Sequence, residues 1–448
     1  MICYGKNKKL CRLNKKGFTL IETLVGSMVF ALVALSAYQA FGGLMDGVSV
    51  SRAKIAATSL VNEQLEIIRN LAYDDVGIES GLPVGTIERT QTLLRDNYSF
   101  TVTTTIRNID DTFDGTIGGN PSDTSPADYK SVDLDITCSN CKRFNPLKFT
   151  TLVAPYALET ASTNGALFMQ VIDAQGVPIQ GVSVHLVNTQ TNPDIIIDET
   201  TDNGGWIKIV DAPPGVNAYN ITATKTGFTT DQTYPPGGAG GADPINPDAT
   251  VVIQQVTQTS FSIDEESTLD VSSVDATCAS LPDIGFSLTG TKLIGLPDIL
   301  KYNTQNFTTD VSGNYTVNNL EWDTYGFLVT SALYDLTGAS LLPTFTINPA
   351  ENKTLAMVVV PHLEKALLVS VQDANGVALD GATVQLQKDI FNETKTTNSG
   401  PCPTPGQVFW NGLADGTYTL TVSKAGYQTD ISSFPLSSWQ NQNVILNP

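Results

Sequence analysis

The stretch Lys15-Lys-Gly-Phe-Thr-Leu-Ile-Glu22, with the uncharged run at residues 23–45 behind it, decides how the chain begins. Residues 23–45 are mostly Leu, Val, Ala, Phe and Met, and about 20 apolar residues suffice for a helix to cross a bilayer. Residues 1–17 carry six cations and no acid. Because segments rich in lysine and arginine stay on the cytoplasmic side, everything after residue 45 is expected outside the cytoplasmic membrane.

Glu22 is the unusual residue of this segment, because it lies within the apolar stretch and not beside it. A lone carboxylate in hydrocarbon costs at least ~2–3 kcal/mol unless it finds a partner. An ordinary signal peptidase site near residues 34–37 is the alternative interpretation. Such a site would leave Glu22 without a purpose.

The octapeptide that ends at Glu22 resembles the class III signal of type IV pilins and type II secretion pseudopilins. The resemblance implies that a prepilin peptidase in the membrane cleaves after Gly17 and N-methylates Phe18. Lys15 and Lys16 would be the leader charges of this signal. Glu22 would become the fifth residue of the mature chain and pair with the N-terminal ammonium of a neighbouring subunit, which would set the register between packed helices.

A helix is predicted to continue beyond the apolar run. Apolar residues recur at spacings of three and four, at Ala57, Val61, Leu65, Ile68 and Ala72. This spacing is that of an amphipathic helix with one face turned to a core. One helix is therefore expected over residues 18–72.

A small antiparallel sheet is predicted after the helix, from alternating apolar residues at 98–106, 132–136 and 147–153. With the acidic motif at 110–115, residues 18–155 resemble the minor pilins and pseudopilins of the V/I type. The resemblance implies an α+β domain in which the sheet packs on the long helix. The predicted segments are a leader at 1–17, the helix at 18–72 and the pilin-like β domain at 73–158.

The acidic motif could also be read as a calcium loop. The first ligand spacings of such a loop are occupied by Asp110, Thr112, Asp114 and Gly115. The twelfth position, where a bidentate Glu is needed, is Pro121. The segment is therefore predicted to be an acidic turn, and no metal site is expected.

Four of the six cysteines lie beyond the membrane segment, at Cys138, Cys141, Cys278 and Cys402. Disulfides persist in an oxidising compartment, and Cys138 is expected to pair with Cys141 across a turn. Cys278 and Cys402 would then pair by exclusion, one of three pairings that four cysteines allow. Cys402 lies in a proline-rich loop that is expected to be exposed.

The second half of the chain repeats itself at a spacing of 199 or 200 residues. Val-Ile-Asp-Ala-Gln-Gly at 171–176 returns as Val-Gln-Asp-Ala-Asn-Gly at 371–376, and Thr-Lys-Thr-Gly-Phe at 224–228 returns as Ser-Lys-Ala-Gly-Tyr at 423–427. A more degenerate middle copy has an Asp-x-x-Gly turn at 310–313. A spacing held this closely within one chain favours one fold used repeatedly.

The repeated pattern resembles the carboxypeptidase regulatory-like domain family, most closely from Asp415 to Tyr427. That family has a prealbumin-like, seven-stranded β-sandwich. The resemblance implies an all-β second half with three sandwich modules that act as spacers or ligand-binding units, without catalytic activity of their own. The predicted modules occupy residues 162–260, with a flexible Gly/Pro loop at 235–241, residues 276–362 and residues 363–448.

Composition and motifs argue against several function classes. A net charge of −20 repels nucleic-acid phosphates. There are only two histidines; His185 is expected to face solvent, and His362 follows Pro361 at an expected strand end without a cluster of cysteines and acids around it. No hydrolase, phosphate-loop or metalloprotease motif occurs, so no enzyme and no cofactor are predicted. Four aromatic residues at alternating positions could form a sugar-stacking platform, but they are expected to be buried in the sandwich cores: Trp206, Trp322, Trp410 and Tyr418.

These features and resemblances predict a minor pilin-like or pseudopilin-like subunit of a type IV pilus or type II secretion-type filament. Its sandwich modules would serve adhesion or partner binding. The expected partners are the prepilin peptidase, other pilin or pseudopilin subunits, the inner-membrane assembly platform, and a surface glycan or protein ligand. The chain would cross the cytoplasmic membrane once and join a filament after assembly. A bitopic surface protein that never enters a filament is the alternative.

Overall fold

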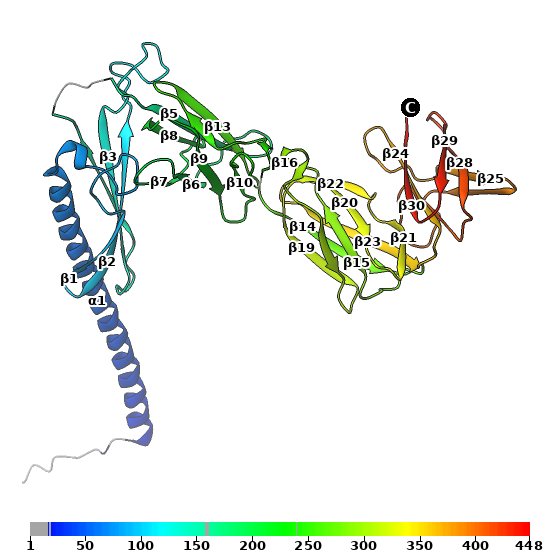
Figure 1. The fold of residues 1–448 in the computed structure, drawn as a ribbon. Coiled ribbons are helices and arrows are strands. Elements are labelled where there is room, and N and C mark those ends of the chain that lie inside the picture. The colour runs from blue at the N-terminus through cyan, green and yellow to red at the C-terminus, as the bar shows by residue number, and fades with distance from the viewer. Residues whose placement is uncertain (1–16, 18, 157–160, 239) are drawn as a thin grey trace, which may run out of the picture. The chain divides into compact units, whose positions relative to one another are not determined.

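The computed structural model describes residues 17, 19–156, 161–238 and 240–448 (Figure 1). The chain divides into two compact units, of which the first comprises Met1–Glu79, Gly85–Ile106 and Lys130–Ala154. The second comprises Ser80–Val84, Arg107–Tyr129 and Pro155–Pro448. The first unit is α+β and the second is all-β, so the predicted fold class is confirmed.

Helix α1 spans Leu20–Arg69 and is capped at Asn70, whose backbone N–H reaches carbonyls of the last turn. The helix therefore ends before the predicted Ala72, which is exposed. The apolar spacing nevertheless predicted the packed face, since Ala57, Val61 and Ile68 are buried.

The sheet of the first unit is an antiparallel meander in the order β1-β2-β3-β4. Its strands are β1 (Thr90–Arg95), β2 (Tyr98–Ile109), β3 (Tyr129–Cys138) and β4 (Leu147–Val153). Alternate residues of β2 and β3, such as Phe100 and Leu134, join the helix in one core. Strand β1 was not predicted, because its sequence Thr-Gln-Thr-Leu-Leu-Arg has two adjacent leucines and no fully buried position.

The first sandwich of the second unit has the sheets β13-β5-β8 and β10-β9-β6-β7, with β12 pairing β9. Residues such as Leu167, Val184 and Phe261 from the two sheets share one core. The strands are β5 (Gly165–Ile172), β6 (Ser183–Asn188), β7 (Ile195–Thr200), β8 (Trp206–Ala212), β9 (Gly215–Thr224), β10 (Asp231–Gln232), β12 (Ala249–Val251) and β13 (Val256–Ser262).

The second sandwich has the sheets β19-β14-β23-β21 and β18-β15-β20-β22. Its first strand ends at Val274, so the module begins before the predicted residue 276. The repeat is less evident in the sequence here, because the turn that follows has Cys278 where the other copies have glycine. The strands are β14 (Ser267–Val274), β15 (Gly285–Thr289), β18 (Gln305–Thr308), β19 (Asn314–Leu320), β20 (Asp323–Val329), β21 (Tyr334–Ala339), β22 (Thr344–Ile347) and β23 (Asn352–Pro361).

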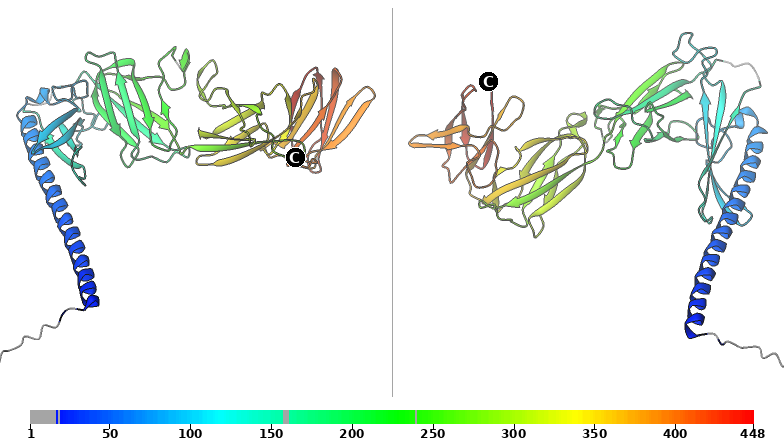
Figure 2. Two further views of the ribbon diagram at one scale, coloured as in Figure 1. Left: turned by 90° about the horizontal axis from the view of Figure 1, so that it is seen from below. Right: turned by 180° about the vertical axis from the view of Figure 1, so that it is seen from behind.

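The third sandwich has the sheets β27-β24-β30 and β26-β25-β28-β29. In each sandwich the first strand pairs in parallel with the last: β5 with β13, β14 with β23, and β24 with β30. The strands of the third sandwich are orange to red in Figures 1 and 2. A common core topology is therefore used three times, to which the first sandwich adds β12 and the second adds β21. The strands are β24 (Ala366–Asp373), β25 (Thr383–Lys388), β26 (Phe391–Thr396), β27 (Gln407–Asn411), β28 (Gly416–Ser423), β29 (Asp430–Leu436) and β30 (Gln440–Leu446).

The turn after the first strand of each sandwich explains the repeated Asp-Ala motif. An aspartate Oδ1 accepts hydrogen bonds of 2.8 to 3.0 Å from the backbone N–H groups two and four residues later, at Asp173, Asp275 and Asp373. The residue three positions after each aspartate has a left-handed backbone, with φ of 82° at Gly176, 64° at Cys278 and 79° at Gly376. This conformation favours glycine, which two of the three copies have.

A second repeated turn precedes β8, β19 and β27 and also ends on a glycine with positive φ, at Gly205, Gly313 and Gly406. A Cβ on Gly205 would lie 2.5 Å from the carbonyl oxygen of Val171, and one on Gly406 would lie 2.5 Å from that of Val371. Here glycine is required both by its backbone angle and by the close approach of the first strand.

These two turns give a matched pair of substitutions in one sandwich. Gly376→Ala should cost only the left-handed backbone strain, ~1–2 kcal/mol, because nothing lies within 4 Å of its Cβ position. Gly406→Ala should cost roughly 2–5 kcal/mol, because overpacking against the Val371 carbonyl is added to that strain. Denaturant unfolding of the two variants measures the difference, and equal losses would refute the close-approach explanation.

The Gly/Pro loop is fixed on both sides of residue 239, because Tyr234 N–H donates to the carbonyl oxygen of Asn246 and Gly237 N–H to that of Gly241. It lies within the first sandwich and leads into β11 (Asp243–Pro244), which pairs with β16 (Leu293–Leu296) of a small hairpin completed by β17 (Ile299–Leu300). A Cβ on Gly295 would lie 1.3 Å from the carbonyl oxygen of Gly240. Two glycines therefore meet where the first sandwich contacts the second.

Candidate functional site

The predicted cleavage region lies at the start of α1. Gly17 is exposed, and Thr19 caps the helix by accepting a 3.3 Å hydrogen bond from the backbone N–H of Glu22 to its Oγ1. Glu22 is exposed in the first helical turn, where a negative charge is favourable. Phe18, Lys15 and Lys16 lie outside the described residues.

The first half of α1 presents apolar side chains with no packing partner among the described residues. Leu20 is 82% exposed and Phe30 75% exposed, and the apolar window has a mean hydropathy of 2.0 with none of its residues buried. The hydroxyls of Thr23, Ser27 and Ser36 donate to carbonyls of the preceding turn, so they cost little in hydrocarbon. The helix is thus long and apolar enough to cross a membrane.

The N-terminal segment that contains Gly17 and the start of α1 is similar to a known family. Residues 12–38 match the family model of the prokaryotic N-terminal methylation motif. The chain carries a prepilin-type N-terminus. The match includes Gly17, Phe18 and Glu22 and the start of the apolar helix, so the recognition of a prepilin signal is confirmed.

Other comparisons add little. No curated protein sequence matches the chain. Among solved structures, the Bacillus anthracis TIE protein is similar at 13% identity and a TM-score of 0.20, covering 81% of this chain and 73% of that one. A Streptococcal ancillary pilin is similar at 15% identity and a TM-score of 0.18, covering 63% of this chain and 98% of that one. The major pilin subunit of Bacillus cereus is similar at 12% identity and a TM-score of 0.17, covering 63% of this chain and 99% of that one. TM-scores this low support no further conclusion.

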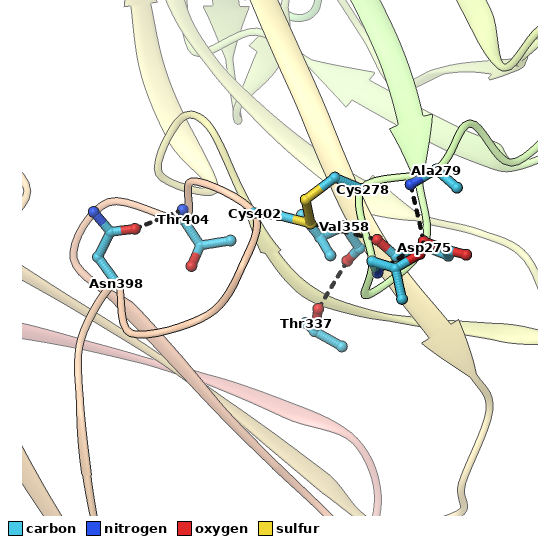
Figure 3. Close-up of a disulfide and its surroundings, with 9 residues drawn as sticks. Asp275, Cys278, Ala279, Thr337, Val358, Asn398, Cys402 and Thr404 are labelled. Atoms are coloured by element: carbon cyan, nitrogen blue, oxygen red, sulfur yellow. Dashed lines mark hydrogen bonds between the residues drawn. A yellow bond between two sulfur atoms is a disulfide. The ribbon is translucent and has the colours of Figure 1, made fainter.

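Both pairs of cysteines are joined in the structure. Cys138 and Cys141 lie 5.6 Å apart between Cα atoms, at the end of β3. Cys278 and Cys402 lie 5.5 Å apart and connect the turn after β14 to the loop before β27 (Figure 3). Cys402 is only 4% exposed, in contrast to the exposed loop expected, because it is covered at the contact between the second and third sandwiches.

Gln407 makes a second connection between these two sandwiches. Its side chain is buried, and Nε2 donates to the carbonyl oxygen of Ala339 at 2.9 Å while Oε1 accepts from the N–H of Ala339 at 3.0 Å. It thereby bonds both backbone groups of Ala339, at the end of β21. Leu368, Phe409 and Trp439 of the third sandwich pack on the core of the second. The disulfide therefore reinforces a contact that is already hydrogen-bonded and packed.

The acidic segment does not have the geometry of a calcium loop read in sequence order. Asp110 accepts from the backbone N–H of Ile117 at 3.0 Å, and Gly115 has a φ of 133°. Carboxylate oxygens of Asp114, Asp123 and Asp128 instead lie within 4.8 Å of one another. Buried oxygens of Asp110, Asp123 and Asp128 have no hydrogen-bond partner in the structure. Such an arrangement of oxygens could hold a hard divalent cation, which the spacing alone did not indicate.

The same carboxylates predict a pH dependence of this segment. Burial, with a contribution from Asp123 and Asp128, raises the pKa of Asp110 to about 6, and burial also raises that of Asp128. A carboxyl whose pKa is raised by folding stabilises the native state below its unfolded pKa of about 4. That stability is lost as the pH rises through 6.

Hydrogen exchange of residues 107–129, in chelator and corrected for intrinsic rates, should therefore show higher protection at pH 4.5 than at pH 7. Equal or higher protection at pH 7 would contradict this prediction.

The histidines and aromatic residues end in different environments. His185 is half-exposed as predicted, with Nδ1 2.6 Å from Asp198. The Nδ1 atom of His362 lies 2.7 Å from a carboxylate oxygen of Asp335, an acid that is 27 residues away in the sequence. The sandwich core holds Trp410 and Tyr418, as predicted. The other two predicted core aromatics, Trp206 and Trp322, are only partly buried, and Trp322 lines a cavity.

Proposed function

We propose that this protein is a subunit of a type IV pilus or type II secretion-type filament. In this proposal the prepilin peptidase cleaves after Gly17 and methylates Phe18, and the apolar half of α1 holds the mature chain in the cytoplasmic membrane until assembly. The observation that carries the proposal is the methylation motif at residues 12–38, directly continued by an unpacked apolar helix.

Glu22 supports assembly in preference to simple anchoring. It is the only charged residue between Phe18 and Met45, and a membrane anchor has no use for it. When α1 helices pack in a filament, its carboxylate can neutralise the N-terminal ammonium of a neighbouring subunit, and omission of either charge leaves the other buried and unpaired. The pair would fix the register between subunits.

The three sandwiches favour a low-abundance subunit that displays them for adhesion or partner binding. The second unit contains about 290 residues beyond the pilin-like part, a bulk that is difficult to repeat along a tightly packed shaft. A minor subunit at a filament tip can accommodate it. The alternative is a bitopic surface protein that keeps its anchor and never enters a filament.

Fractionation in a native host tests the proposal. Sheared filaments should contain the protein together with other pilin or pseudopilin subunits, and deletion of the prepilin peptidase should leave the full-length chain in the membrane. If shearing never releases the protein although filaments are recovered, the bitopic alternative is correct.

A further inference from the structure

A cavity of about 420 Å³ lies where the first and second sandwiches meet. The first sandwich contributes residues of β10 and β13, including Gln232 and Phe261, and the second contributes the start of β16 and the turn between β19 and β20, including Glu321 and Trp322. Small-molecule sites occur preferentially between domains and have volumes of roughly 300–1,000 Å³. The position and volume of this cavity are therefore those of a ligand site.

The charged groups of the cavity are already paired with one another. Lys292 Nζ lies 2.7 Å from Glu321 Oε1, and Lys301 Nζ lies 2.8 Å from Glu321 Oε2. Lys301 Nζ is also 4.0 Å from Asp231 Oδ1, so the network connects the two sandwiches. Two lysines and two acids cancel in charge. An ionic ligand would have to break one of these pairs, whereas an uncharged ligand would not.

The polar walls of the cavity are held by further hydrogen bonds. Asp231 Oδ2 accepts from the N–H of Ser262 at 2.9 Å, and Asn246 Nδ2 donates to the carbonyl oxygen of Gln232 at 3.1 Å. Pairing of β11 with β16 continues in a 3.0 Å bond from the N–H of Ile245 to the carbonyl oxygen of Ile294. Groups fixed in this way bind a ligand without a large loss of side-chain entropy.

Trp322 gives the cavity an aromatic surface. Its indole is partly exposed, and Lys292 Nζ lies 3.4 Å from the ring centroid, which fixes the ring by a cation–π contact. Other tryptophans have structural roles: Trp410 is 1% exposed in the third core, and the indole N–H of Trp439 donates to the Leu336 carbonyl. An indole face beside paired carboxylates, ammonium groups and amides suits a molecule that has C–H faces and many hydroxyls.

We propose that this cavity binds an uncharged carbohydrate. The face of the Trp322 indole opposite Lys292 stacks on a sugar ring, Glu321 and Asp231 accept hydrogen bonds from its hydroxyls, and Lys292 donates to them while it keeps its contacts with Glu321 and the indole. The net charge of −20 disfavours sialylated or sulfated sugars at the same site. The inference rests on the proposed function, because only a displayed module meets surface glycans.

The test uses the full chain, solubilised in a zwitterionic detergent without a sugar headgroup, on an array of neutral, sialylated and sulfated oligosaccharides. Neutral glycans should bind, and calorimetry with the best of them should give about tenfold or greater loss of affinity for Trp322→Ala. Trp322→Phe should retain part of the affinity. The matched control is Trp206→Ala, which removes a partly buried tryptophan outside the cavity and should leave the affinity unchanged.

The proposal is overturned if no neutral glycan binds, if only acidic glycans bind, or if a folded Trp322→Ala variant binds as tightly as the parent. Thermal unfolding of each variant establishes that it is folded. Failure here leaves the filament proposal intact, because incorporation depends on α1 and is measured in sheared filaments. Conversely, a chain that binds glycans but never enters filaments would contradict only the filament proposal.

Discussion

Glu22→Ala should abolish incorporation of this protein into filaments while leaving it in the membrane. Without the carboxylate, the N-terminal ammonium of a neighbouring subunit would enter the helix bundle unpaired, and removal of one partner from a buried ion pair costs roughly 3–5 kcal/mol. That cost corresponds to a change of more than a hundredfold in the assembly equilibrium. The measurement is the ratio of the protein in sheared filaments to that in the membrane.

Two further variants test whether the charge at this position is what assembly requires. Glu22→Gln keeps the shape of the side chain but not its charge, so it should fail to assemble as Glu22→Ala does. Glu66→Ala removes a carboxylate from the exposed face of the same helix, where its ion pair with Arg69 is worth less than about 1 kcal/mol, and it should assemble normally. Normal assembly of Glu22→Ala would establish that the carboxylate has no role in filament packing.

Replacement of both Cys278 and Cys402 by serine should lower the free energy of unfolding of the second and third sandwiches by roughly 4–5 kcal/mol. The disulfide closes a loop of 124 residues, and a loop of this size restricts the unfolded chain strongly. The two sandwiches should still pack on each other, because Gln407 and the side chains around Trp439 remain. Denaturant unfolding measures the loss.

The other disulfide is the matched control. Cys138 and Cys141 are separated by three residues, so replacement of both by serine removes much less chain entropy, about 2 kcal/mol or less. An unchanged midpoint after loss of Cys278 and Cys402, or a peptide map that finds Cys402 as a free thiol, would contradict the stapled arrangement.

Local pattern predicted the elements whose chemistry is contiguous in sequence. The apolar run predicted the start of the helix, and the spacing at Ala57 and Val61 predicted its packed face. The 200-residue repeat predicted the sandwiches. The start of the second sandwich was missed because Cys278 occupies a turn position at which the other copies have glycine. The repeated turn motif is interrupted at Cys278, although buried and partly buried residues alternate regularly in the preceding strand β14.

Sites assembled from distant segments could not be predicted. Asp114 meets Asp123 and Asp128 across a loop, and Asp335 meets His362 from 27 residues away. Trp322 was assigned to a core because alternation alone does not distinguish the inner face of a sandwich from a surface that a neighbouring module partly covers. Trp322 and Asp231 line one cavity, where the two sandwiches are connected by the pairing of β11 with β16 and by Lys301.

Mass spectrometry of the N-terminus of the mature protein tests the central claim most directly. If the chain is a processed prepilin, the first residue is N-methylated Phe18, and Lys15 and Lys16 are absent with the rest of the leader. Because Gly17 is the residue before the cut, Gly17→Val should leave the leader attached. A mature chain that begins near Tyr38, or one that retains its leader in the presence of an active prepilin peptidase, would contradict the account.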